Sequence, residues 1–462
     1  METIMKNKMG YEKEGPLLLK MSLPLVFSML LQAMYNVVDS IFVTRLSEDA
    51  LTAVSLAFPV QNLMSAIAVG TSVGMNALLS RRLGERRVED ANRAAAHGML
   101  LEFASSLVFV LFGLFLVRPY FNIVAAGEPE IAGMGVTYLS ICTTMSTAVF
   151  LQLGIEKILQ GEGRTVPTMF IMATGAILNI IFDPILIFGL CGFPALGIAG
   201  AAYATVGGQI ASMILGFILL YSSKMQVRLS FRGFRWEGET VKQIYSVGLP
   251  SIIMQSISTI MTLTVNKLLI TYSTTAVAVF GIYFKVQSIV FMPVFGMTAA
   301  SMSIIAYNFG AERRDRMMRT HWISLAAAMI YMGIGMLVFE LFPGAILGIF
   351  DASEEAMAIG VKTLRILAPC FIIAAYSIVN STLFQAVDRG FYSMAISISR
   401  QLLVLIPVAI LISALTRNLD MVWLAWPIAE VASLFVTFFL YLRVKHTILD
   451  RMDAPVPRDL AD

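Results

Sequence analysis

The chain has 462 residues, of which 58% are apolar and 14% are charged, with a mean hydropathy of +0.79 and a net charge of +3. Soluble domains are about half apolar and about 25% charged, so this composition excludes an ordinary soluble enzyme, a secreted disulfide scaffold, a disordered protein and a nucleic-acid-binding protein. The three Cys and three His residues lie far apart, which argues against a disulfide framework and a metal cluster.

Long apolar blocks follow one another along the chain, and each is long enough to cross a membrane as a helix. Twelve spans are predicted: 17–44, 51–80, 94–117, 131–159, 166–189, 196–221, 243–272, 277–307, 320–348, 360–386, 391–415 and 421–442. The polar stretch 222–242 divides them into an N-lobe, 17–221, and a C-lobe, 243–442, with terminal segments 1–16 and 443–462. This spacing leaves no room for a soluble catalytic domain.

Basic residues are concentrated on one side of the predicted membrane. Of 33 Lys and Arg residues, 24 fall in the N-terminal segment from Lys6, in alternate loops, in the linker that begins with Lys224, or in the tail that ends with Arg458. Only Arg45, Arg118, Lys362 and Arg417 lie on the other side. The positive-inside rule therefore predicts that both termini are cytoplasmic.

The two halves of the chain repeat each other at a shift of 226 residues. Matching pairs include Leu23-Pro24 with Leu249-Pro250, Ser47 with Ser273, Ala50 with Ala276, Gln61 with Gln287, Gly70 with Gly296, Gly84 with Gly310 and Arg87 with Arg313. Six spans separate the copies, so the repeats have the same orientation. We predict an all-α integral membrane protein with twelve transmembrane helices in two parallel six-helix bundles around a central cleft, an architecture in which transporters bind substrate between the bundles.

Acidic residues inside spans are costly, at about 2.5–3.5 kcal/mol on insertion scales, so they mark candidate functional sites. Asp39 shares one face of span one with Gln32 and Tyr35, which precede it by seven and four residues, and Asn36 flanks this stripe. The alternative is that Asp39 lies near the helix end and pairs with Arg45. We favour a functional role, because the six-residue separation does not make these two residues helical neighbours.

Asp183 forms a second candidate site with Asn179, one helical turn earlier. Pro184 follows and removes a backbone donor, which frees a carbonyl near Ile180; the alternative is that Asn179 satisfies this broken turn. Asp39, Asp183 and Thr205 have similar predicted depths, so we expect them to meet in the outer half of the N-lobe. Their oxygens could bind a hard cation such as Na⁺ or exchange a proton, and the residues alone do not separate the two.

Other acids in the spans receive weaker assignments. Glu156 lies near the cytoplasmic end of span four, where it either attracts cationic substrate or is an interfacial acid paired with nearby bases. Glu102, Glu340 and Glu430 are interpreted as satisfied groups, with Lys267, Lys285, Arg365 and Arg400 as candidate partners in undetermined pairs. Lys285 is also a candidate to line the central cleft. The second repeat has Val265 and Val408 where the first has its two acids, so the ion chemistry is assigned to the N-lobe.

The chain resembles the MATE (multidrug and toxic compound extrusion) transporters, in particular bacterial members of the DinF and MepA type. The resemblance rests on Leu23-Pro24, on 32–39 (QAMYNVVD), on 179–184 (NIIFDP), on 197–202 (GIAGAA) before Thr205, and on 159–164 (LQGEGR). It implies a coupling site for H⁺ or Na⁺ at Asp39, Asn179, Asp183 and Thr205, and substrate contacts at Gln32, Tyr35, Asn36 and Glu156. Pro24 is then the hinge around which span one bends.

The resemblance implies a secondary antiporter of the cell inner membrane that exports amphipathic organic cations in exchange for inward H⁺ or Na⁺. No nucleotide-binding loop or hydrolytic motif is present, so we expect no enzyme activity and no cofactor apart from the coupling ion. The expected partners are small organic cations and membrane lipids, without nucleic acid or an obligate protein partner, and the chain is expected to be a monomer. Two alternatives remain open: a lipid-linked oligosaccharide flippase of similar architecture, or a narrow-specificity metabolite exporter.

Overall fold

The computed structural model describes residues 7–222, 225–350 and 352–452. Its described residues are almost entirely helical, in the order η1 (Lys8–Gly10), α1 (Glu14–Leu46), α2 (Glu48–Gly84), α3 (Val88–Phe115), α4 (Val117–Val124), α5 (Pro129–Thr144), α6 (Thr147–Gly161), α7 (Thr165–Phe188), α8 (Ile198–Ser222), α9 (Gly238–Leu269), α10 (Thr274–Gly310), α11 (Arg314–Leu341), α12 (Pro343–Gly348), α13 (Glu354–Leu367), α14 (Cys370–Ala386), α15 (Gly390–Ile398), η2 (Ser399–Leu405), α16 (Ile406–Thr416), α17 (Leu419–Val422), α18 (Ala425–Val444), η3 (Lys445–Leu449) and α19 (Asp450–Met452). Here η1 is a 3₁₀-helix, whereas η2 and η3 are π-helical segments.

These helices confirm a multi-pass membrane protein. Ten helical segments of the described chain are long and apolar enough to cross a membrane, and two bent pairs bring the number to twelve. The pairs are α5 with α6, bent by 44°, and α13 with α14, bent by 47°. Spans four and ten are therefore broken helices, a feature that continuous apolar runs did not reveal.

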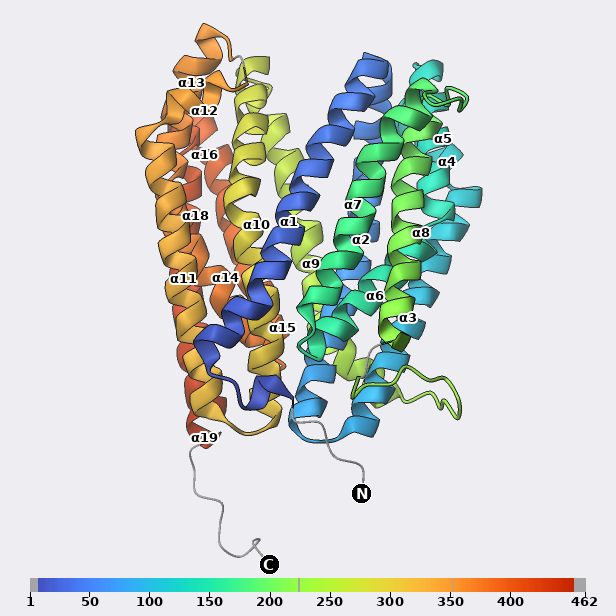
Figure 1. Cartoon of the computed structure of the whole chain (residues 1–462). Coiled ribbons are helices and arrows are strands. Elements are labelled where there is room, and N and C mark those ends of the chain that lie inside the picture. Colours follow the sequence, from blue (N-terminus) through green and yellow to red (C-terminus); the bar gives the residue numbers. More distant parts are fainter. Residues whose placement is uncertain (1–6, 223–224, 351, 453–462) are drawn as a thin grey trace, which may run out of the picture.

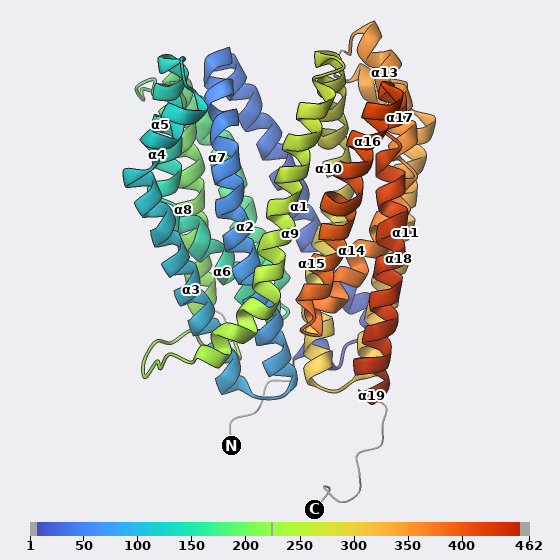
Figure 2. The ribbon, with the colours of Figure 1, turned by 180° about the vertical axis from the view of Figure 1, so that it is seen from behind.

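Two helical lobes lie side by side (Figures 1 and 2). The N-lobe comprises α1–α8 and the C-lobe α9–α19, and each has its own apolar core, around Phe121 and Leu139 in one and around Phe280 and Phe371 in the other. The α2–α3, α8–α9 and α10–α11 loops lie at the same end of the molecule as η1 and α19, and we call this the basic end (Figure 1). Lys6, Lys224 and Arg458 lie outside the described residues.

The sequence repeat is visible in matching local structure. Ser47 caps α2 by accepting a hydrogen bond from the Ala50 amide at 2.9 Å, and Ser273 caps α10 in the same way through Ala276 at 3.0 Å. The loops that follow these helices also match, since Arg86 and Glu312 both have a positive φ, of 61° and 55°. The polar pairs of the repeat thus set equivalent helix boundaries in the two lobes.

Glycines allow the lobes to touch at the basic end. A Cβ on Gly84 would lie 1.9 Å from the carbonyl oxygen of Tyr307, and one on Gly310 would lie 2.0 Å from that of Arg81. Arg81 and Tyr307 are themselves related by the shift of 226, so one contact is the pseudo-twofold copy of the other. From this end the ribbons of the two lobes diverge toward the opposite end (Figures 1 and 2).

Candidate functional site

Four predicted residues from three helices meet inside the N-lobe, and we call Asp39, Asn179, Asp183 and Thr205 the N-lobe site. The Nδ2 atom of Asn179 donates to Thr205 Oγ1 at 3.2 Å and makes a longer contact of 3.4 Å with Asp183 Oδ1. Asp39, on α1, is a hydrogen-bonding neighbour of the Asp183 carboxyl. Residues on α1, α7 and α8 with similar expected depths are therefore brought together.

The N-lobe site has unused acceptor atoms. Asp183 is fully buried, and its Oδ2 atom and the Oδ1 atom of Asn179 have no hydrogen-bond partner among the described residues. Asp39 forms no ion pair with Arg45 within the described chain, which is the alternative that the sequence left open. Because buried acceptors without donors are costly, this arrangement suits a group that brings positive charge, such as a proton or a cation.

The donor set also limits which cation could bind. No group of three or more His, Cys, Asp and Glu side chains is positioned to hold a metal ion in the described parts of the chain. Two carboxylates, an amide oxygen and a hydroxyl are instead hard oxygen ligands, which suit Na⁺ better than a transition metal. The same two neighbouring carboxyls could share a proton.

A second layer of polar side chains surrounds Asp39, including two residues that sequence reasoning missed. Tyr35 has Gln32 as a hydrogen-bonding neighbour and lies near both acids. Tyr138, on α5, is almost fully buried near Asp39, and its hydroxyl is 3.4 Å from Gln61 Nε2. The sequence signal for Gln61 was its repetition as Gln287, whereas Tyr138 had no signal beyond its position inside a span.

The remaining predicted residues of α1 occupy other positions. Asn36 is exposed, and its carbonyl oxygen accepts a hydrogen bond from Ser40 at 2.8 Å. Pro24 interrupts α1 nearer the basic end, where its carbonyl accepts from Ser28 Oγ at 2.9 Å. A Cβ on Gly296 of α10 would lie within 3.0 Å of Leu25 and Val26, so Pro24 is next to a close contact between the lobes.

Glu156 belongs to a separate polar cluster on α6. It is buried, accepts from Gln152 Nε2 at 3.0 Å and lies near Lys157, whose Nζ donates to Gln160 at 2.8 Å. The Lys157 carbonyl accepts from Asn76, and Asn76 in turn accepts from Ser303 of the C-lobe at 3.2 Å. Glu156 is thus connected to the contact between the lobes rather than to the N-lobe site.

A partly buried ion pair lies among the described residues of the C-lobe. Arg400 Nη1 and Glu430 Oε1 are 3.2 Å apart, with Tyr283 and Cys370 nearby. The other acids considered for these undetermined pairs form no ion pair among the described residues: Glu102 accepts from Ser72 at 2.8 Å, and the backbone carbonyl of Glu340 accepts from Arg365 at 3.3 Å. Lys267 and Lys285 are exposed and form no ion pair in the described chain.

Comparisons with known proteins identify the family and support the two-lobe helical fold. The family model MatE matches residues 24–185 and 250–411, one match in each lobe. A protein of Shewanella oneidensis named FAD transporter is 26% identical over 431 residues, which cover 93% of this chain and 95% of that protein. The multidrug export protein MepA of Staphylococcus haemolyticus is 24% identical over 434 residues, 92% of this chain and 93% of that one. A crystal structure described as MATE in complex with MaL6 has a TM-score of 0.91 and 26% identity, and the alignment covers 97% of this chain and 100% of that one.

Proposed function

Because this chain belongs to the MATE family of membrane transporters, we propose that it exports amphipathic organic cations in exchange for H⁺ or Na⁺ bound at the N-lobe site. The observation that carries this proposal is the pair of neighbouring buried acids, Asp39 and Asp183, with unused acceptors at Asp183 Oδ2 and Asn179 Oδ1. One elementary charge that moves down 100 mV releases about 2.3 kcal/mol, which can drive the export of a substrate.

Alternating access would move the two lobes against each other. The glycine contacts of Gly84 and Gly310 close the basic end, and the lobes diverge from there, which supports an outward-facing state if the basic end is cytoplasmic. Binding of H⁺ or Na⁺ at Asp39 and Asp183 would bend α1 around Pro24, narrow the N-lobe cavity and expel the substrate. The basic loops favour cytoplasmic termini in the cell inner membrane, and the chain would work as a monomer without a cofactor.

The substrate would contact the polar stripe on α1. Gln32, Tyr35 and Asn36 adjoin Asp39, and this acid would attract the positive charge of an organic cation. Glu156 is buried beside Lys157, so we propose for it a role at the inner entrance only after the lobes have separated there. Competition between substrate and coupling ion for Asp39 would then link the export of substrate to the inward movement of the ion.

A second candidate is a substrate with an anionic group, such as a flavin nucleotide. Lys285 lies well inside α10, is exposed and has no ion-pair partner in the described chain. A charged residue inside a span usually faces a water-filled cavity rather than lipid, so Lys285 could bind a phosphate in the cleft. The similarity to the protein named FAD transporter favours this candidate.

Transport assays in everted membrane vesicles test these proposals. We expect a Na⁺ or a pH gradient, imposed separately, to drive uptake of ethidium by the expressed protein and not by Asp39→Asn, with equal amounts of both proteins in the membrane. FAD uptake that is lost in Lys285→Gln would favour the second candidate. No transport of either compound under both gradients would reject both and favour a flippase or a narrow-specificity metabolite exporter.

A further inference from the structure

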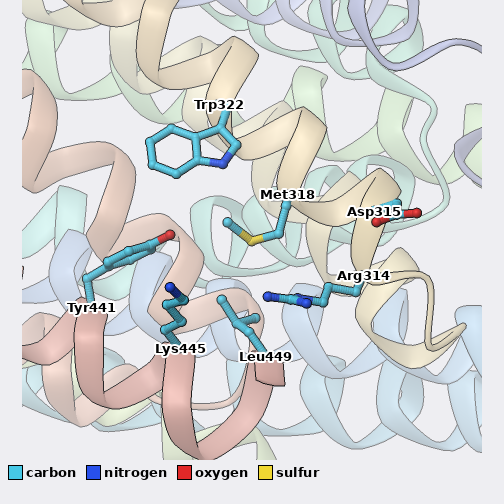
Figure 3. Close-up of a pocket in the computed structure, with 7 residues that line it drawn as sticks. All are labelled: Arg314, Asp315, Met318, Trp322, Tyr441, Lys445 and Leu449. Carbon is cyan, nitrogen blue, oxygen red and sulfur yellow. The ribbon is translucent and has the colours of Figure 1, made fainter. Parts of the chain in front are cut away.

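A basic pocket lies between α11 and the C-terminal end of α18, at the basic end of the C-lobe and apart from the sites described above. Its volume is about 260 Å³, and Figure 3 shows the side chains that line it. The lining side chains are Arg314, Asp315, Met318 and Trp322 from α11, and Tyr441, Lys445 and Leu449 from α18 and η3.

Two matching rows of side chains form the pocket. Arg314, Met318 and Trp322 are spaced by four residues on α11, and Tyr441, Lys445 and Leu449 have the same spacing on the facing helix, so each set forms one ridge along its helix. The rings of Trp322 and Tyr441 meet with their centroids 6.2 Å apart and close one end of the pocket. Beyond them the helix changes to π-helical geometry at Lys445, a feature often found at functional sites.

Of the two cations that line the pocket, Arg314 is ion-paired with Asp450, whereas Lys445 is not ion-paired within the described residues. The Lys445 Nζ atom and the Arg314 guanidinium point into the same space, whereas the Asp315 carboxylate points away (Figure 3). Asp450 is 3.3 Å from Arg314, but it also contacts His446 at 3.1 Å. The Lys445 ammonium, with N–H groups of the ion-paired Arg314 facing the same space, favours an anion with several acceptor oxygens, and phosphate has that chemistry.

The pocket adjoins the surface that faces lipid. Trp322 is 50% exposed, and exposed apolar side chains continue from it along α11 and α18, among them Ile323, Ile330, Phe438 and Phe439. Tryptophan and tyrosine at the end of a span are typical of the membrane–water interface. A ligand at this depth would have its charged group among the basic residues and its apolar part along these helices.

We propose that this pocket binds the phosphate headgroup of an anionic phospholipid from the leaflet at the basic end, with Lys445 and Arg314 as ligands and Trp322 and Tyr441 beside the upper acyl chain. Basic pockets between helices on the cytoplasmic side of membrane proteins recognise such headgroups. The proposal does not depend on the ion that is coupled or on the substrate that is transported.

Quenching of tryptophan fluorescence by brominated lipids tests the site. The full chain would be reconstituted in phosphatidylcholine vesicles that contain either brominated phosphatidylglycerol or brominated phosphatidylcholine. The difference in fluorescence between the unchanged chain and Trp322→Phe gives the quenching of Trp322 alone. One basic residue near the membrane surface contributes about 1 kcal/mol to the binding of an anionic lipid. We therefore expect phosphatidylglycerol to bind about fivefold more strongly than phosphatidylcholine at this position. This preference should disappear in Lys445→Gln.

Two control variants separate a built pocket from general surface charge. Lys445→Arg should keep the preference, and so should Arg443→Gln, because Arg443 is exposed on the same helix end but does not line the pocket. A preference that persists in Lys445→Gln, or that Arg443→Gln removes equally, would overturn the proposal. Inorganic phosphate that abolishes the preference at matched ionic strength would instead assign the pocket to a soluble anion.

Discussion

In the N-lobe, Asp39 and Asp183 lie beside each other with an amide and a hydroxyl, whereas in the C-lobe Glu430 forms an ion pair with Arg400 at 3.2 Å. Both clusters lie inside helical bundles that are related by the sequence repeat. One cluster therefore has acids without a compensating base in the described chain, and the other brings its own positive charge. We propose that a mobile cation or proton supplies in the N-lobe the positive charge that Arg400 supplies permanently in the C-lobe.

The two lobes differ in their charged clusters but share equivalent helix ends and equivalent contacts across the lobe interface. Gly84 and Gly310 make equivalent contacts across the lobe interface, and Ser47 and Ser273 make equivalent helix caps. Residues that set helix ends and close packing are therefore repeated, while the two acids of the N-lobe site, Asp39 and Asp183, are replaced by Val265 and Val408. A transporter of this kind can keep a symmetric motion and still couple it to an ion in one lobe only.

The largest effect is expected from Arg400→Met. It leaves Glu430 buried without its partner, and breaking a buried ion pair costs about 3–5 kcal/mol of folding stability. Thermal unfolding in detergent should show this loss, and the double variant Arg400→Met/Glu430→Leu should recover most of it. Wild-type stability in the single variant would contradict the view that Arg400 is a permanent counter-charge.

Asp183→Asn should act on transport and not on folding. Removal of one coupled charge forfeits about 2.3 kcal/mol per 100 mV, or about 50-fold in substrate accumulation. Gradient-driven ethidium transport measures this effect. Glu102→Gln is the matched control, because Glu102 is also a buried acid of the N-lobe but accepts from Ser72. Equal losses of transport in both variants would show that replacing any buried acid of the N-lobe impairs transport, and would contradict a specific role for Asp183.

Gly84→Ala and Gly310→Ala test the equivalent contacts across the lobe interface. A Cβ would lie 1.9 Å from a backbone carbonyl oxygen of the other lobe at Gly84, and 2.0 Å from one at Gly310. Because this overlap strains the contact, each substitution should destabilise the closed arrangement of the basic end by about 1–3 kcal/mol. Transport rates should fall to a similar extent in the two variants and stay unchanged in Gly333→Ala, where a Cβ meets no atom within 4 Å. Clearly unequal effects at Gly84 and Gly310 would show that the interface is not symmetric in function.

Much of the fold could be predicted from the sequence, because long apolar runs and repeated polar pairs directly reflect membrane crossing and helix ends. The ends of α1 and α7 lie close to the predicted spans 17–44 and 166–189. The breaks between α5 and α6 and between α13 and α14 did not follow, since hydropathy averages over a bend. The π-helical segment that contains Arg400 was likewise invisible to helical periodicity.

The candidate site was predictable where its residues share a helix face or have similar depths in the membrane. The spacing of Gln32, Tyr35 and Asp39 indicated one face of α1, and a simple comparison of depths suggested that Asp183 and Thr205 lie nearby. Tyr138 and Gln61 come from α5 and α2. The position of Tyr138 near Asp39, and of Gln61 beside Tyr138, depends on how those helices pack, which spacing within one helix does not show. The partner of Glu430 was undetermined for the same reason.

The smallest effect is expected from Tyr138→Phe, which removes the hydroxyl that contacts Gln61 and Cys142 near Asp39. One neutral hydrogen bond contributes about 1 kcal/mol, so the concentration of H⁺ or Na⁺ that gives half-maximal transport should rise about fivefold while the maximal rate stays similar. Tyr283→Phe is the matched control, because Tyr283 is equally buried but lies beside the Arg400–Glu430 pair. If both substitutions shift the ion dependence equally, the C-lobe also takes part in coupling. A shift in Tyr138→Phe alone would instead confine the ion to the lobe whose acids lack a base.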